Sequence, residues 1–268
     1  RPKSSAASDV YKRQDVGDLI RANTRLIWCE SPGSVTMEVQ DVPAIVQAAH
    51  AKGVAVALDN TYAAGVMFDA FEHGVDVSMQ ALTKYVGGHS DLLLGSVSAR
   101  DDLAYYKLGP IYQQLGLAVS PDDCSLALRG LQTLAIRLDA LETSTLKVAL
   151  WLADNPIVDK VLHPALPSCP GHDIWVRDFT GSTSVFSFTF KNHFTAGQVV
   201  NFVNMLKIFK IGMSWGGVNS LAVVYPALER PNQDFDGRIV RLNIGLEVTS
   251  DLIDDLDQAF TNMPVSDF

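Results

Sequence analysis

Asp59 and Lys84 each stand at the end of an apolar segment, where a polar side chain can do chemistry. Asp59 closes VAVALDN, and a carboxylate there is costly to bury without a partner; the alternative is that it caps the segment that follows. Lys84 directly follows VDVSMQAL. In a desolvated pocket its pKa would fall and its amine would become nucleophilic, although a single lysine is more often a solvated surface charge. One strand apart, the two residues together indicate a site.

Arg241 lies inside the apolar segment RIVRLNIGLE. A guanidinium among Ile, Val and Leu needs a planar partner that accepts two hydrogen bonds, and the carboxylate of a substrate is one option. An internal salt bridge with an acid such as Glu247 is the other. The sequence leaves both options open.

The segments that carry Asp59 and Lys84 belong to an alternation of short apolar runs and amphipathic stretches. From Leu26 the order is RLIWCE, DVPAIVQAAHAKG, VAVALDN, VDVSMQAL and LLLGSVSA. This order predicts strands joined by crossovers in a buried, mainly parallel sheet, with ligands beyond the carboxyl ends of the strands. A helix is predicted from about Asp41 to Lys52, because it has an Asp N-cap, a Pro in its first turn and Gly53 at its end.

A change of pattern in the middle of the chain predicts a second unit. Residues 121–154 are rich in Leu and Ala, which predicts one long helix or two joined at Gly130. Beyond them, STSVFSFTF and RIVRLNIGLE favour strands, and TAGQVVNFVNMLK and SDLIDDLDQAF favour helices. We therefore expect an α/β fold, with a partial, mainly parallel sheet domain at 15–130 and a smaller α+β domain at 131–268. Residues 1–14 are basic and rich in Ser and Ala, and we set them apart as a disordered tail or an artefact.

Composition excludes several classes of protein. The 268 residues carry a net charge of −9, which opposes nucleic-acid binding because phosphate recognition uses clustered Lys and Arg. Cys29, Cys124 and Cys169 are too few and too scattered for a disulfide framework or a zinc site, and we interpret them as reduced thiols. No apolar run approaches the roughly 20 residues that span a bilayer, and the N-terminus lacks signal-peptide order. These exclusions predict a cytoplasmic protein without a metal, a membrane or a nucleic-acid partner.

Short motifs occur in a fixed order along the chain. They are Glu30-Ser31-Pro32, Asp59-Asn60-Thr61, Thr83-Lys84-Tyr85 with Gly88-His89-Ser90-Asp91, and Arg241-Leu242 with Ile244-Gly245-Leu246-Glu247. In this order they resemble the trans-sulfuration (Cys/Met metabolism) family of enzymes that depend on pyridoxal 5'-phosphate (PLP). The resemblance extends from about Asp15 to the C-terminus. It implies the PLP-dependent transferase-like fold of fold type I.

Two further motifs bear on the branch of that family. SPGS at 31–34 and MSWGG at 213–217 resemble the cystathionine β-lyase branch more than the branches that act at the γ-carbon, which more often have Asn in place of Ser34. The resemblance thus implies conversion of cystathionine to homocysteine, pyruvate and ammonia, in methionine biosynthesis. Within the family, the alternatives are methionine γ-lyase and cystathionine γ-synthase or γ-lyase. Outside it, the alternative is an inactive chain in which Asp59, Lys84 and Arg241 form only structural ion pairs.

The resemblance also implies which residues hold the cofactor. Lys84 would bind PLP covalently and then move the Cα proton of the substrate as a general base. Asp59 would pair with the protonated pyridine nitrogen and keep the ring an electron sink. Thr83 would give its hydroxyl to the phosphate. His89 belongs to its motif, but its spacing does not support metal ligation and favours a hydrogen-bonded structural histidine.

The implied substrate is a small sulfur-containing amino acid. Arg241 would hold its α-carboxylate, helped by backbone groups at Ser214 and Trp215. Ser34 and Tyr62 would shape the substrate pocket, and ordinary core packing is the alternative for Tyr62.

The resemblance further implies that the chain is an N-terminally truncated member of a homotetrameric family. The segment before Asp15 in full-length members supplies the glycine-containing phosphate loop and the aromatic ring that stacks on the cofactor. An anion site of this kind relies on backbone N–H groups. We therefore expect the chain alone to bind PLP poorly and to turn over little substrate.

Overall fold

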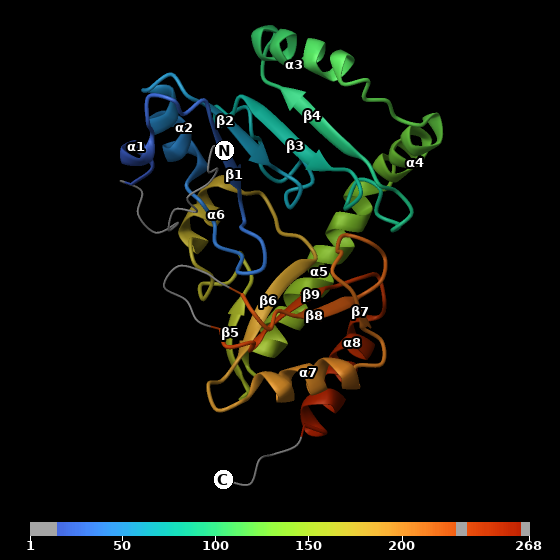
Figure 1. The fold of residues 1–268 in the computed structure, drawn as a ribbon. Helices are drawn as coiled ribbons and strands as arrows, with labels where there is room; N and C mark the ends of the chain where they lie inside the picture. Colours follow the sequence, from blue (N-terminus) through green and yellow to red (C-terminus); the bar gives the residue numbers. More distant parts are fainter. Residues whose placement is uncertain (1–14, 229–234, 264–268) are drawn as a thin grey trace.

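The computed structural model describes residues 15–228 and 235–263, which form two β-sheets stacked one above the other in Figure 1; the tail expected at 1–14 lies outside the described residues. The first sheet has the order β1-β2-β3-β4. Its first three strands are parallel and β4 is antiparallel to β3, which confirms the mainly parallel sheet. The strands are β1 (Leu26–Glu30), β2 (Ala55–Asp59), β3 (Val77–Ala81) and β4 (Gly95–Ala99).

Helix α2 (Val42–His50) covers one face of this sheet, beside the short α1 (Asp15–Leu19). The Asp41 side chain caps it by accepting a hydrogen bond from the backbone N–H of Ala44 at 3.2 Å. Val42, Val46 and Ala49 recur at helical spacing and are buried, so one face of α2 packs on the apolar side of the strands. The predicted helix is therefore present, with its cap at the expected residue.

Three helices follow the first sheet. The helix α3 (Asp102–Gln114) has no buried residue and lies beyond β4 in Figure 1. The Leu/Ala-rich stretch, for which one long helix or two were expected, forms two helices, α4 (Pro121–Leu131) and α5 (Leu134–Ala153). Gly130 precedes the break, and a Cβ there would lie 2.0 Å from the carbonyl oxygen of Val86. Only glycine permits this close approach of the two backbones.

The second sheet has the order β5-β6-β9-β8-β7. Neighbouring strands are antiparallel, except that β7 and β8 are parallel. The strands are β5 (Val158–Leu162), β6 (Val185–Phe190), β7 (Lys210–Ile211), β8 (Leu221–Val224) and β9 (Ile239–Asn243). The helices of this half are α6 (His172–Asp178), α7 (Ala196–Met205) and α8 (Thr249–Thr261).

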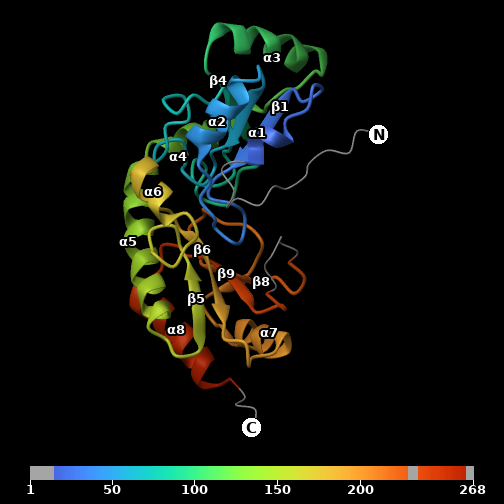
Figure 2. The same ribbon diagram turned by 90° about the vertical axis from the view of Figure 1, so that its left-hand side faces the viewer.

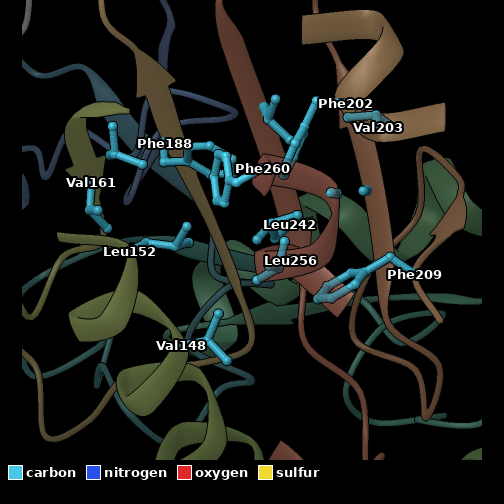
Figure 3. Close-up of a cluster of buried hydrophobic side chains, with 14 of the residues drawn as sticks. Val148, Leu152, Val161, Phe188, Phe202, Val203, Phe209, Leu242, Leu256 and Phe260 are labelled. Carbon is cyan, nitrogen blue, oxygen red and sulfur yellow. The ribbon is translucent and has the colours of Figure 1, made fainter. Parts of the chain in front are cut away.

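An aromatic core holds the second sheet against its helices. Phe188 of β6, Phe202 of α7 and Phe260 of α8 gather in Figure 3, with ring centroids of Phe202 and Phe260 4.4 Å apart. The C-terminal half of α5 adds Val148 and Leu152 to this core. Its N-terminal half packs instead with the core of the first sheet, so α5 runs along both sheets in Figures 1 and 2. The division into domains at 130/131 stays a prediction.

No helix within the described ranges is long and apolar enough to cross a membrane.

Asp255 fixes the segment before β7 to α8, which yields a test of stability. Its buried carboxylate accepts hydrogen bonds from the backbone N–H groups of Lys207, Ile208 and Phe209 at 2.7–3.2 Å. Asp255→Ala leaves these donors unpaired and should lower the free energy of unfolding by roughly 3 kcal/mol. Denaturant unfolding measures this free energy. Asp254→Ala, an exposed neighbour, is the matched control, and equal losses in both variants would contradict the assignment.

His163 makes stability depend on pH. It is fully buried, and burial lowers its pKa to about 4. Nδ1 accepts from the backbone N–H of Ala165, and Nε2 has no partner among the described residues. Between pH 6.5 and about 4, the unfolded chain therefore binds a proton at this histidine and the folded chain does not. As the pH falls through this window, the free energy of unfolding falls by about 3 kcal/mol.

His163→Gln should flatten the dependence of unfolding free energy on pH between 6.5 and 4. His193→Gln, at an exposed histidine, should not reduce the slope by a comparable amount. An unchanged slope in His163→Gln would show that this histidine is not buried in its neutral form.

Candidate functional site

A cavity of about 170 Å³ opens where the carboxyl ends of β1, β2 and β3 meet the second sheet. Both halves of the chain contribute to its wall, as expected for a ligand site at the end of parallel strands. Its lining residues are Glu30, Pro32, Gly33, Ser34, Val35, Met37, Asp59, Thr61, Tyr62, Ala81, Lys84, Val185, Trp215 and Arg241.

Lys84 reaches the cavity from a tight turn after β3, residues 82–88, which we call the lysine turn. Its Nζ donates a hydrogen bond to Oγ of Ser214 at 2.9 Å and lies 5.2 Å from the centre of the Trp215 ring. Burial lowers the pKa of the Lys84 ammonium, and the positive charge of Arg241 lowers it further. An amine of this kind is more easily deprotonated and hence nucleophilic.

Asp59 ends β2 and lines the same cavity as Lys84. Its Oδ1 accepts from the backbone N–H of Thr61 at 3.0 Å and from the Thr61 hydroxyl at 2.5 Å. The same hydroxyl oxygen accepts from the N–H of Ala81 at 2.9 Å. Thr61 thereby ties the ends of β2 and β3 together. Both bonds to Asp59 reach Oδ1, so within the described residues Oδ2 remains available to a cation in the cavity.

Arg241 lies in the middle of β9 and is 8% exposed. One Nη donates to the carbonyl of Met213 at 2.6 Å, and the guanidinium lies 5.5 Å from the ring of Tyr225. The salt bridge with Glu247 that the sequence left open is not formed, because Glu247 accepts from the N–H and hydroxyl of Ser220 at 2.8 Å. No described carboxylate lies within ion-pair distance of Arg241. The guanidinium can therefore pair with the carboxylate of a ligand in the cavity.

Asn243 holds the segment 213–217 against the cavity. Its Oδ1 accepts from the N–H of Gly216 and from the hydroxyl of Ser184, each at 2.8 Å. Gly216 has a φ of +79°, and a Cβ there would lie 3.1 Å from Lys84. Sequence reasoning missed Asn243. Its spacing of two from Arg241 was the available signal, since such residues share a face of the strand.

The predicted pocket residues Ser34 and Tyr62 line the cavity. Ser34 donates to Oε1 of Glu30 at 2.7 Å. Tyr62 is buried, which raises the pKa of its phenol, and its oxygen accepts from the N–H of Thr183 at 3.3 Å. In the loop that carries Ser34, Val35 has a φ of 72° and Met37 a φ of 58°. These are uncommon values for residues with a Cβ, and such strain concentrates at functional sites.

The structure does not bring Thr83 to the cavity lining. Its hydroxyl donates to the carbonyl of Leu94 at 3.2 Å and accepts from the N–H of Leu94 at 3.0 Å, so the role in phosphate binding stays a prediction. Ser214 meets Lys84 through its side chain, whereas its carbonyl accepts from Arg241 at 3.5 Å. The His89 ring bonds the carbonyl of Gly87 at 2.7 Å. The described residues contain no group of three or more His, Cys, Asp or Glu placed to hold a metal ion.

Together, the cavity presents an amine, a carboxylate and a guanidinium. Arg241 can bind a carboxylate, Lys84 can attack a carbonyl or take up a proton, and Asp59 can pair with a ring cation. These functions match the binding of an α-amino acid beside an aromatic cofactor.

Known proteins resemble the chain over most of its length. The sequence pattern of one family, described as Cys/Met metabolism PLP-dependent enzyme, matches residues 4–261. A putative cystathionine beta-lyase of Saccharomyces cerevisiae is 47% identical over 76% of the chain, and cystathionine beta-lyase MetC of Escherichia coli is 43% identical over 93%. The chain spans 60% and 65% of the length of these relatives. A solved cystathionine gamma-lyase from Lactobacillus plantarum has a TM-score of 0.88 at 27% identity, covering 96% of this chain and 69% of that one.

Arg241→Met tests the repulsion between the two cations in the cavity. Only the unprotonated amine reacts with acetic anhydride, so the pH profile of acetylation at Lys84, read by peptide mass spectrometry, reports its pKa. Loss of the positive charge should move the profile to higher pH, although burial keeps it below that of an exposed lysine. Arg238→Met, which removes a cation paired with Asp236, is the control. A profile that moves equally in both variants would contradict the coupling.

Proposed function

Because the chain belongs to the Cys/Met metabolism family of PLP-dependent enzymes, we propose that it is a carbon–sulfur lyase that cleaves cystathionine by β-elimination. The observation that carries this proposal is the shared cavity of Lys84 and Arg241. The amine has a lowered pKa, and the guanidinium has no carboxylate partner among the described residues. The α-carboxylate of an amino acid can pair with this guanidinium.

The residues of the cavity fit PLP at two of its ends. Lys84 supplies a nucleophilic amine for the aldehyde, and Asp59 supplies a carboxylate oxygen for the protonated pyridine nitrogen. The predicted phosphate ligand is not placed for that role, because the Thr83 hydroxyl donates a hydrogen bond to the carbonyl of Leu94 and accepts one from its N–H. We therefore propose that Lys84 and Asp59 hold the cofactor, and that the chain alone binds it weakly.

When bound, PLP supplies an electron-poor ring that stabilises negative charge at the Cα of the substrate. Asp59 keeps the positive charge on the pyridine nitrogen that this requires. Arg241 orients the substrate through its α-carboxylate, and Nζ of Lys84 then takes the proton from Cα. The hydrogen bond from Nζ to Ser214 holds the amine above the Trp215 ring.

The bond between Cβ and sulfur breaks next; the sulfur keeps the electron pair, and the leaving thiolate takes up a proton to give homocysteine. Overall, cystathionine and water give homocysteine, pyruvate and ammonia. Tyr62 and Ser34 line the cavity, and we propose that they shape the pocket for the sulfur-containing side chain. The whole protein would then serve methionine biosynthesis in the cytoplasm, as a homotetramer.

A γ-lyase is the second candidate, because the fold is close to that of a solved cystathionine gamma-lyase. The sequence favours the β-lyase, since the chain is 43% identical to an enzyme of that name from Escherichia coli. The products separate the two: cystathionine gives pyruvate by β-elimination and 2-oxobutyrate by γ-elimination. Formation of 2-oxobutyrate without pyruvate would overturn the β-lyase assignment.

Covalent trapping tests the cofactor role of Lys84. The chain is incubated with excess PLP, reduced with borohydride and digested, and the modified lysine is identified by mass spectrometry. Reduction makes even weak binding permanent, so the label should gather at Lys84. Lys84→Met should abolish it, whereas Lys160→Met, at an exposed lysine, should leave it unchanged. Labelling spread evenly over surface lysines would contradict the proposal.

A further inference from the structure

Arg137 is a buried cation outside the cavity. It lies in the first turn of α5 and is 6% exposed. Within the described ranges, no carboxylate lies within ion-pair distance of its guanidinium. A buried charge without an anionic partner is costly, so its surroundings must compensate it.

Carbonyl oxygens provide that compensation, and two of them belong to the lysine turn. Nη1 donates to the carbonyl of Tyr85 at 2.7 Å. Nη2 donates to the carbonyl of Gly130 at 2.8 Å and approaches that of Val86 at 3.4 Å. Tyr85 directly follows Lys84 in the chain. The guanidinium therefore joins the backbone beside Lys84 to the C-terminal end of α4, whose carbonyls carry partial negative charge.

The packing around this guanidinium leaves little freedom. A Cβ at Gly88, the last residue of the lysine turn, would lie 2.1 Å from Nη1 of Arg137. Nε of Arg137 donates to the hydroxyl of Thr133 at 3.1 Å, which fixes the plane of the guanidinium. The turn itself is closed by a hydrogen bond from the N–H of Gly88 to the carbonyl of Lys84 at 2.7 Å.

From this geometry we propose that Arg137 is a positioning residue for Lys84: its planar fork fixes the carbonyls of Tyr85 and Val86, and so aims the Lys84 amine into the cavity. The role rests on the proposed function of Lys84, but it acts through the backbone and involves no contact with cofactor or substrate. A lysine in place of Arg137 keeps the charge but cannot span the same carbonyls. Without the fork, the turn loosens and the Lys84 amine reaches water.

The acetylation profile of Lys84, measured without cofactor, tests this proposal. In Arg137→Met and in Arg137→Lys the profile should move to higher pH, because the amine is better hydrated and farther from Arg241. At a pH below the ordinary lysine range, the fraction of Lys84 acetylated should fall several-fold. Arg129→Met is the matched control, since Arg129 lies on α4 and forms an exposed ion pair with Asp91.

Circular dichroism establishes that each variant is folded under the labelling conditions. An unchanged Lys84 profile in folded Arg137→Met overturns the proposal. If that variant does not fold, Arg137→Lys decides, and a wild-type profile there overturns the proposal as well. Because no cofactor is present, the outcome is independent of the trapping experiment, which alone decides whether Lys84 binds PLP.

Discussion

Two cations face one cavity, and much of the structure around it serves to hold them there. The Lys84 ammonium comes from the turn after β3 and the Arg241 guanidinium from β9 of the second sheet, and the charge of Arg241 lowers the pKa of Lys84. Like charges in a half-buried space repel each other. Neutral acceptors compensate them in part: the Ser214 hydroxyl for Lys84, and the Met213 carbonyl for Arg241. Glu30 and Asp59 also line the cavity, but no described carboxylate lies within ion-pair distance of Arg241, and the carboxylate of an amino-acid substrate can take that place.

The scaffold fixes these groups through polar contacts between distant parts of the chain. The Thr61 hydroxyl is hydrogen-bonded to both Asp59 and Ala81, and so it links the end of β2 to the end of β3. Asn243 accepts hydrogen bonds from Gly216 and Ser184, and thereby fixes the position of the segment that carries Ser214 and Trp215. The chemistry of the cavity thus depends on side chains that do not themselves react. Precise placement of this kind is what converts a set of polar residues into a site.

The sequence predicts the first sheet and the helix α2 that covers it. It also predicts that Asp59, Lys84 and Arg241 belong to one site. Asp59 and Lys84 each follow an apolar strand, and the ends of parallel strands meet at one edge. Arg241 lies on β9 of the second sheet, which is antiparallel to its neighbours, so its place beside them followed from the family resemblance and not from the strand pattern. The sequence does not predict Arg137, because an arginine in a Leu/Ala-rich helix suggests a solvated face. Nor does it predict α3, whose Gly109 and Pro110 disfavour a helix and which buries no residue. The Thr83 hydroxyl turns toward Leu94 through a contact that local pattern cannot reveal.

The most direct test of the coupling between Lys84 and Arg241 in one cavity is a measurement of the Lys84 pKa. Nuclear magnetic resonance on the chain with isotopically labelled lysine gives this pKa, with and without added glycine. We predict a value below the ordinary 10.5 in the free chain, which rises when the glycine carboxylate binds near Arg241. A value at or above 10.5 that glycine does not change would contradict the account.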